Sequence, residues 1–180
     1  MALERIYNPN TRWYLFYPEA IKDFASVAES EEISAKVLND AVAAGLGFNI
    51  TCAVNQDGSN FDLGDSETDD SLTFCQVAGS VNPTSLNPDI QYEVEMSRDR
   101  KAKNVANTAV NLIAYKGREY FAVLSVGETP DAPFAAGERV KMARVVTDYG
   151  TYQIGSGENI RVQSQLGNRG DVAWNIKVTA

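Results

Sequence analysis

Two glutamates, Glu93 and Glu95, are the residues of this sequence whose type and spacing best fit acid–base chemistry. Side chains two apart on a strand share one face and lie roughly 7 Å apart, and a carboxylate pair near that separation can serve glycosidic bond cleavage. The same two residues also suit the wet face of a half-buried strand. We favour the wet face, because no further residue marks a catalytic site beside them.

Other routes to catalysis have little support. The chain contains no histidine, which removes the commonest general base, the commonest metal ligand and every Ser-His-Asp or Cys-His arrangement. A Ser-Lys or paired-carboxylate mechanism stays open, although no pattern indicates one. The glycine pairs at 45 and 47 and at 155 and 157 lack the further glycines and the strand–helix setting of a nucleotide-binding loop. We therefore expect no enzyme activity and no cofactor.

An acidic segment, residues 58–71, lies within a stretch of the chain that has no Lys or Arg between Val37 and Ser97. The segment lacks the Asp-x-Asp-x-Asn/Asp-Gly order and the distal Glu of an EF-hand loop, so we expect no metal site. A long acidic loop in a compact domain is more typical of an interaction surface or of a lack of order. Its acidic residues are Asp62, Asp65, Glu67, Asp69 and Asp70.

Four cations follow shortly after the two glutamates: Arg98, Arg100, Lys101 and Lys103. Such a cluster can hold phosphate. A cluster of this kind more often neutralises a neighbouring acidic surface, or begins a helix in solvent, and we favour those two interpretations.

The elements that position these residues follow from periodicity. Alternating polarity predicts a strand over residues 90–97, with Gln91, Glu93 and Glu95 on a wet face that carries no cation. Apolar residues at helical spacing predict a helix over 104–115, which Gly117 ends. A second strand is predicted over 120–126.

Further strands are predicted at 12–17, 48–54, 72–77, 138–147, 160–166 and 171–179, and short helices at 20–28 and 34–44. The strand at 12–17 is apolar on both faces, which indicates a central strand or one covered by a partner. Glycines at 167–170 favour a hairpin between the last two strands. These elements predict an all-β fold with one flanking α-helix, an antiparallel β-sandwich or open barrel. We expect an N-terminal arm at 1–11 and a single domain at 12–180 that carries the long acidic loop.

Size and charge exclude several classes of protein. The chain has 180 residues, of which 44% are hydrophobic, and this suits one packed domain. A formal net charge of −8 opposes DNA binding, which relies on Lys and Arg. The sequence shows neither a signal-peptide pattern nor a membrane-spanning run, so we expect synthesis in the cytoplasm and no membrane partner. In that reducing compartment Cys52 and Cys75 are expected to be free and buried.

The order of these features resembles a known family. Asp69-Asp70-Ser71-Leu72-Thr73-Phe74-Cys75 runs into a Gly/Pro-bearing loop and the strand at 90–97. The helix at 104–115 turns through Lys116-Gly117-Arg118-Glu119 into the strand at 120–126. Ala132-Pro133-Phe134-Ala135-Ala136-Gly137-Glu138 precedes the strand at 140–148. Over residues 34–178 this order resembles the major tail tube subunits of long-tailed phages, siphophage type, especially those of actinobacterial hosts.

The resemblance implies a structural virion protein. Six copies would form a ring, rings would stack into a hollow tail tube, and sheets of neighbouring copies would join into one inner barrel that conducts DNA during ejection. Expected partners are other copies of the chain and other tail proteins such as the tape measure, terminator and distal tail proteins. An acidic bore would let DNA slide without specific binding.

The resemblance also suggests roles for particular residues. Gln91, Glu93 and Glu95 would line the lumen. The acidic residues of segment 58–71 would contact a neighbouring subunit, with Arg98, Arg100, Lys101 and Lys103 as their cationic partners. The N-terminal arm and its aromatic strand would add to the sheet of an adjacent subunit.

Two alternatives stay open. One is another ring-forming tail component, such as a tail terminator. The other is a monomeric binding module, for instance a carbohydrate-binding sandwich, whose exposed platform would be formed by Trp13, Tyr14, Phe16 and Trp174.

Overall fold

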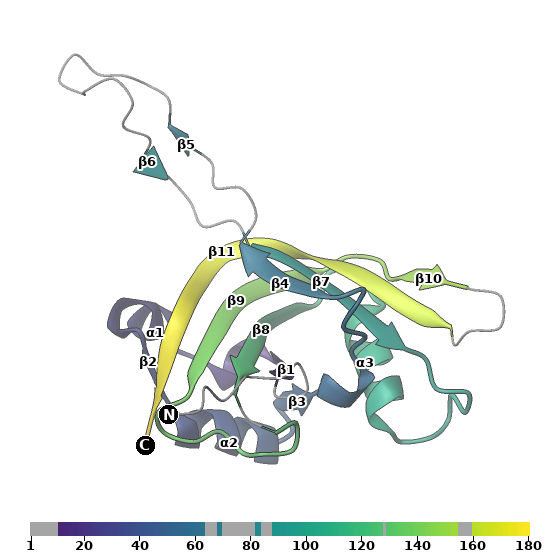
Figure 1. Ribbon diagram of the computed structural model, residues 1–180, viewed down its shortest axis with the longest axis horizontal. Helices are drawn as coiled ribbons and strands as arrows, with labels where there is room; N and C mark the ends of the chain where they lie inside the picture. The colour runs from purple at the N-terminus through teal and green to yellow at the C-terminus, as the bar shows by residue number, and fades with distance from the viewer. Residues whose placement is uncertain (1–10, 64–67, 70–81, 84–87, 128, 155–159) are drawn as a thin grey trace, which may run out of the picture.

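One curved, unclosed sheet of nine strands forms the body of the protein, shown in Figure 1 as a computed structural model. The structure describes residues 11–63, 68–69, 82–83, 88–127, 129–154 and 160–180. The main path through the sheet runs β3-β1-β8-β9-β11-β7-β4, and β10 and β2 pair with β11 outside that path. The β2–β11 pairing is parallel, and the other pairings are antiparallel. The predicted all-β class is confirmed, in the form of an open barrel.

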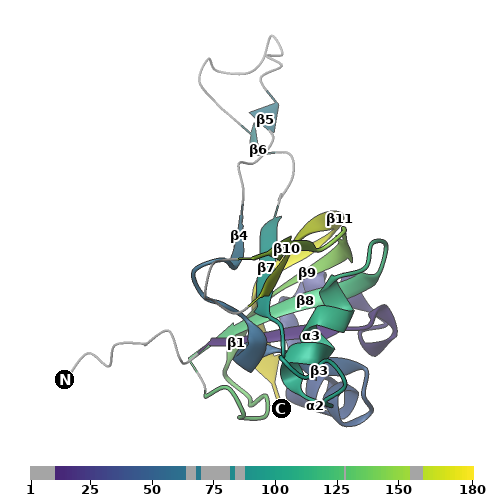
Figure 2. The same ribbon diagram turned by 90° about the vertical axis from the view of Figure 1, so that its right-hand side faces the viewer.

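The strands of this sheet are β1 (Thr11–Phe16), β2 (Glu32–Ser34), β3 (Gly47–Asn49), β4 (Asn60–Leu63), β7 (Pro88–Glu95), β8 (Glu119–Val126), β9 (Arg139–Thr147), β10 (Thr151–Gln153) and β11 (Arg161–Thr179). A separate pair, β5 (Thr68–Asp69) and β6 (Asn82–Pro83), lies beyond the ends of β4 and β7 (Figure 2). The helices are α1 (Phe24–Ser30), α2 (Ala35–Ala43) and α3 (Val105–Ile113), with 3-10 turns η2 (Pro18–Ala20) and η3 (Thr51–Ala53).

Both faces of the central strands are buried. On one side, here the α3 face, Leu15, Tyr92 and Val145 pack with α3 and η3 in one core cluster. On the other side, the α2 face, Phe16 and Met142 pack with α1 and α2 in a second cluster. The predicted flanking helix is α3, and the short helices expected at 20–28 and 34–44 correspond to α1 and α2 on the opposite face. Each face needs a cover, because β1, β8 and β9 bury mostly apolar side chains on both sides of the sheet.

Aromatic side chains fill the mouth of the open barrel. Trp13 packs edge-on against Tyr92 with ring centroids 5.2 Å apart, and against Phe61 of β4 at 5.9 Å. Phe61 in turn lies 5.6 Å from Trp174 of β11. These contacts join strands that are distant along the sheet, so the sheet stays curled although no ladder of the described residues closes it.

The principal helix forms as its sequence predicts. Asn104 caps α3 by accepting a hydrogen bond from the Asn107 backbone N–H at 2.9 Å. Ala109, Leu112 and Ile113 are buried on its apolar stripe. Beyond its end, Gly117 has a φ of 86°, a backbone angle that favours glycine, and leads into β8.

The prediction of a hairpin at 160–179 is wrong. Residues Arg161–Thr179 form one long strand, β11, whose register against β9 shifts twice. Gly170 and Asn175 have positive φ angles of 90° and 70° beside these shifts, so the glycine serves a bulge and not a turn. Arg144 of β9 spans the first shift, 3.1 Å from Asp171 and 2.9 Å from Glu119. The hydrogen bond to Asp171, and to a smaller extent the one to Glu119, raises the pKa of Arg144.

Two other strand predictions differ from the structure. The run at 48–54 divides into β3 and the turn η3, because Ile50 and Ala53 must reach the α3 core from the edge of the sheet. The first part of the predicted acidic loop is strand β4, which pairs with β7. The predicted strand at 72–77 lies outside the described residues.

Candidate assembly surfaces

Among the described residues, no helix packs on the part of the α2 face formed by β7, β4 and the first half of β11, and this part presents a polar surface. Gln91 lies opposite Gln165 and Glu95 lies opposite Arg161 in the ladder, so these side chains share one face. Ile90, Tyr92 and Val94 point to the buried α3 face. The predicted alternation is therefore confirmed, and we call this surface, with Gln91, Glu93, Glu95, Arg161, Gln163 and Gln165, the polar face.

Hydrogen bonds fix the amides of the polar face. Gln91 Nε2 donates to the Gly58 carbonyl at 2.9 Å. Gln165 Nε2 donates to Asp89 at 2.8 Å, and Gln153 of β10 donates to Gln163 at 3.1 Å. The surface is thus a network of uncharged polar groups with a few charges among them.

Glu93 differs from its predicted setting, because it is only 8% exposed. Asn55 Nδ2 donates to its carboxylate at 2.7 Å, and Arg161 forms an ion pair with it at 3.2 Å. The turn that bears Gly58 lies so close that a Cβ at this position would overlap the Glu93 carboxylate. The expectation of a fully wet face without a cation is therefore wrong at this position, since Arg161 comes from β11, which sequence alone did not pair with β7.

The four cations of the 98–103 turn all stay exposed. Asp99 and Asn104 hold the turn: Asp99 accepts from the Lys101 backbone N–H at 3.0 Å, and Asn104 donates to Ser97 at 3.0 Å. Within the described part of the chain, none of the ion pairs includes Arg98, Arg100, Lys101 or Lys103. The structure therefore leaves these cations available to a partner.

The predicted acidic contact residues are only partly placed. Asp62 lies on β4, mostly exposed, with its carboxylate 3.4 Å from Lys141 of the same chain. Asp69 belongs to β5. Asp65, Glu67 and Asp70 lie outside the described residues, so the predicted pairing between the acidic and basic segments stays a prediction.

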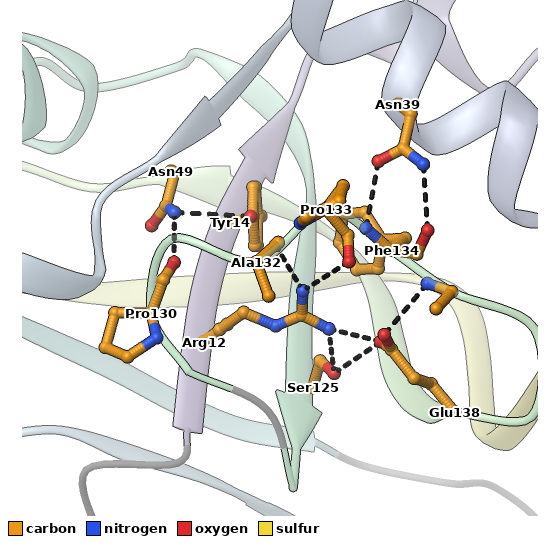
Figure 3. A network of polar contacts seen from close by, with 11 residues as sticks. Arg12, Tyr14, Asn39, Asn49, Ser125, Pro130, Ala132, Pro133, Phe134 and Glu138 are labelled. Atoms are coloured by element: carbon orange, nitrogen blue, oxygen red, sulfur yellow. Dashed lines mark hydrogen bonds and ion pairs between the residues drawn. The ribbon is translucent and has the colours of Figure 1, made fainter.

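A buried ion pair anchors the start of β1, and sequence analysis did not find it (Figure 3). Arg12 is fully buried and pairs with Glu138, which is almost fully buried. The same guanidinium donates to Ser125 at 2.9 Å and to the Ala132 carbonyl at 2.6 Å. The only available signal was an arginine at one alternate position of an otherwise aromatic strand.

The network fixes the loop between β8 and β9. Asn39 of α2 exchanges two hydrogen bonds of 2.9 Å with the Phe134 backbone, and Asn49 donates to the Pro130 carbonyl at 2.7 Å. Arg12 lies 4.8 Å from the centre of the Phe134 ring. The loop between β8 and β9, which contains the Ala132-to-Glu138 motif, is thus held from β1, β3 and α2.

The aromatic strand β1 lies inside the sheet, between β3 and β8 of its own chain. It is therefore not available to extend a neighbour's sheet, and the prediction is wrong for this strand; the rest of the arm, residues 1–10, lies outside the described residues. The edges of the main path are the short strands β3 and β4. Tyr14 and Phe16 are buried and Trp13 and Trp174 pack against the core, so the predicted aromatic platform for a carbohydrate does not exist.

The described residues show little that suits catalysis. They hold no cluster of three or more His, Cys, Asp or Glu side chains that fits a metal ion, and no helix among them has the length and apolar character needed to cross a membrane. Burial raises the pKa of the Tyr92 and Tyr120 hydroxyls, which keeps both phenols neutral. Cys52 is free and exposed, contrary to the expectation that it would be buried.

Comparison with known proteins supplies one assignment. The sequence model of the family described as Phage tail tube protein matches residues 4–180. No curated protein matches the chain.

Proposed function

The chain belongs to the phage tail tube protein family, and from this we propose that six copies form a ring and that rings stack into a hollow tube that conducts DNA during ejection. A structural role in the phage tail, with self-assembly and contacts to other tail proteins, follows from the family itself. The ring, the bore and the passage of DNA are the proposal. Synthesis in the host cytoplasm and contacts with tape measure, terminator and distal tail proteins belong to it as well.

The observation that carries this proposal is the combination of an unclosed sheet and a polar face on which none of the described helices packs. A sheet that ends in short edge strands, β3 and β4, has unpaired backbone groups that a neighbouring sheet can satisfy. Closure around a ring removes such edges. The polar face then has a natural place on the inner wall, because its amides and carboxylates attract no phosphate strongly and its arginine, Arg161, is paired with Glu93.

The proposal assigns the lumen to Gln91, Glu95 and the outer part of Glu93. Glu95 is exposed, whereas Glu93 is mostly covered by the turn at 55–59. Glu95 is therefore the more direct probe of the lumen. The inter-subunit contact of the exposed cations at 98–103 with the acidic residues of segment 58–71 is a further part of the proposal.

The self-assembly test is negative-stain electron microscopy of the purified chain. The tube function predicts long hollow tubes of uniform width. Isolated rings of one layer would favour the alternative of a tail terminator. A chain that stays monomeric by light scattering at every concentration would contradict the proposal.

The lumen test compares two equal charge changes in phage particles. Glu95→Lys should slow genome ejection, because a cation on the inner wall attracts passing phosphate. The matched control is Glu29→Lys on helix α1, which is also exposed but lies outside the polar face. Equal ejection rates of the two variants would show that the polar face does not line the bore.

A further inference from the structure

An exposed apolar segment lies beside the polar face, and none of the surfaces proposed so far includes it. Tyr149, Tyr152 and Ile154 are 73%, 53% and 77% exposed, and they fall within six residues of each other around β10. Exposed apolar side chains in such a group mark a binding surface more often than isolated ones do. We call residues 149–154 the β10 segment.

The backbone of the β10 segment is held on both sides. The Gly150 N–H donates to the Ala114 carbonyl at 3.3 Å, and a Cβ at this glycine would lie 2.7 Å from Val162 Cγ1. Tyr152 then lies opposite Val162 in the β10–β11 ladder. Close contact with α3 and pairing with β11 therefore present the apolar side chains on a defined support.

Two cations lie over exposed tyrosine rings in this region, one at Tyr149 and one at Tyr115. Lys116 Nζ lies 5.5 Å from the centre of the Tyr149 ring, and the Arg118 guanidinium lies 4.8 Å from that of Tyr115. Both side chains belong to the turn that follows α3. Lys116 also forms an exposed ion pair with Asp148 at 3.6 Å. The surface is thus apolar, and the cation at its margin that no acidic side chain pairs with among the described residues is Arg118.

A groove that also has apolar walls, but carboxylates beside it, lies elsewhere on the chain, between the start of β1, η3 and the end of β8. It measures about 540 Å³, and Trp13, Val54, Leu124, Val126 and Pro130 supply its apolar walls. Cys52 also lines it. Two exposed carboxylates, Asp57 and Asp131, directly follow the lining residues Gln56 and Pro130 in the sequence, so they lie next to the groove.

We propose that the β10 segment of one copy docks into this groove of the next copy. Apolar side chains would meet apolar walls, while Arg118 would approach the carboxylates Asp57 and Asp131, and Lys116 would have to exchange its pairing with Asp148 to join it. The β10 segment (labelled β10 in Figure 1) and the groove belong to different elements of one chain, because the groove is lined from β1, η3 and β8, so the contact would join two copies head to tail. This inference rests on the proposed self-assembly and adds the surfaces that carry it.

Cys52 makes a direct test available. In a Cys75→Ser background, Ile154→Cys places one thiol on the β10 segment, and Cys52 supplies one in the groove. Oxidation of the assembled protein should give a ladder of disulfide-linked multimers on a non-reducing gel, because each copy links to two neighbours within disulfide reach. Ser30→Cys, on the exposed end of α1, is the matched control in the same background and should give no ladder.

The outcomes separate this contact from the tube function. The docking is supported if electron microscopy shows tubes and the non-reducing gel shows a ladder that requires both Cys52 and the cysteine at position 154. Tubes without a ladder, for Ile154→Cys and also for Tyr152→Cys, overturn the docking and leave the tube function standing. No self-assembly of the unsubstituted chain would overturn both.

A second measurement covers the case in which cysteine substitution itself weakens assembly. Tyr149→Ser with Tyr152→Ser should raise the concentration needed for polymerisation at least tenfold while circular dichroism stays unchanged. Val37→Ser, which removes an exposed apolar side chain from α2, is the control and should leave that concentration unchanged. An equal effect of both changes, or none from the tyrosine pair, would contradict the docking.

Discussion

At the scale of single residues, the buried pair Arg12–Glu138 is the most consequential contact. Burying two charges costs solvation free energy, which is offset only when both ions are paired and their remaining hydrogen-bonding groups are satisfied. Arg12 donates to Glu138, Ser125 and two backbone carbonyls, and Glu138 also accepts from the Ala135 backbone N–H at 2.8 Å. Among the described residues, the Nε–H of Arg12 is the one group of the pair that is buried without a partner. The pair therefore ties β1 to the loop before β9 and selects one arrangement of that loop.

Removing one partner should be costly. Arg12→Ala leaves Glu138 buried without its cation, and we expect the free energy of unfolding to fall by about 3–5 kcal/mol. The double change Arg12→Met with Glu138→Leu should recover much of that loss. Urea unfolding followed by circular dichroism measures both effects.

The control for this experiment is Lys36→Ala, which removes an exposed i, i+4 pair with Asp40. Surface pairs of this kind contribute little, so no clear change is expected. A loss for Arg12→Ala as small as that of the control would show that the buried network does not stabilise the fold.

At the scale of elements, local sequence patterns predicted the helices and strands whose signals are local. They failed where the structure of an element depends on pairing with a strand distant in sequence. The strand at 90–97 and the helix at 104–115 were predictable, because alternation, the Asn104 cap and Gly117 are local signals. The hairpin prediction at 160–179 failed, because glycine marks a bulge as readily as a turn. Only pairing with β9, through Arg144 and Asp171, distinguishes the two. The burial of Glu93 was hidden for the same reason, since Asn55 and Arg161 come from other elements.

Helix α3 gives the prediction at this scale. Asn104→Ala removes the cap and the hydrogen bond to Ser97 that holds the basic turn, so we expect a loss of about 1 kcal/mol in unfolding free energy. Asn111→Ala, on the exposed side of the same helix, should be neutral or slightly stabilising. If thermal melts place the two variants at the same midpoint, the cap does not contribute.

At the scale of the whole molecule, charge is distributed unevenly. The chain carries a net charge of −8, yet six of its 16 cations flank α3, at 98, 100, 101, 103, 116 and 118. Sequence order predicted the polar face and the basic turn as surfaces. It did not predict the groove, because residues distant in sequence line it, nor the β10 segment, because its position depends on pairing with β11 and on the contact with α3.

Charge reversal tests the basic turn. Arg98→Glu with Arg100→Glu should weaken polymerisation, and more strongly at low salt than at high salt, because salt screens exposed charges. Light scattering at two ionic strengths measures this dependence. The matched control is Lys22→Glu with Lys177→Glu, two exposed cations away from α3. An altered thermal midpoint without altered assembly would assign the basic turn to the stability of its own chain instead.

The proposed tube depends most on copies of this chain completing one another's sheet around a polar bore. An electron cryomicroscopy reconstruction of the assembled tube tests this directly. We expect edge strands β3 and β4 beside neighbouring copies, and Gln91, Glu95 and Gln163 facing the bore. A tube in which α1 and α2 face the bore, with both sheet edges open to solvent, would contradict it.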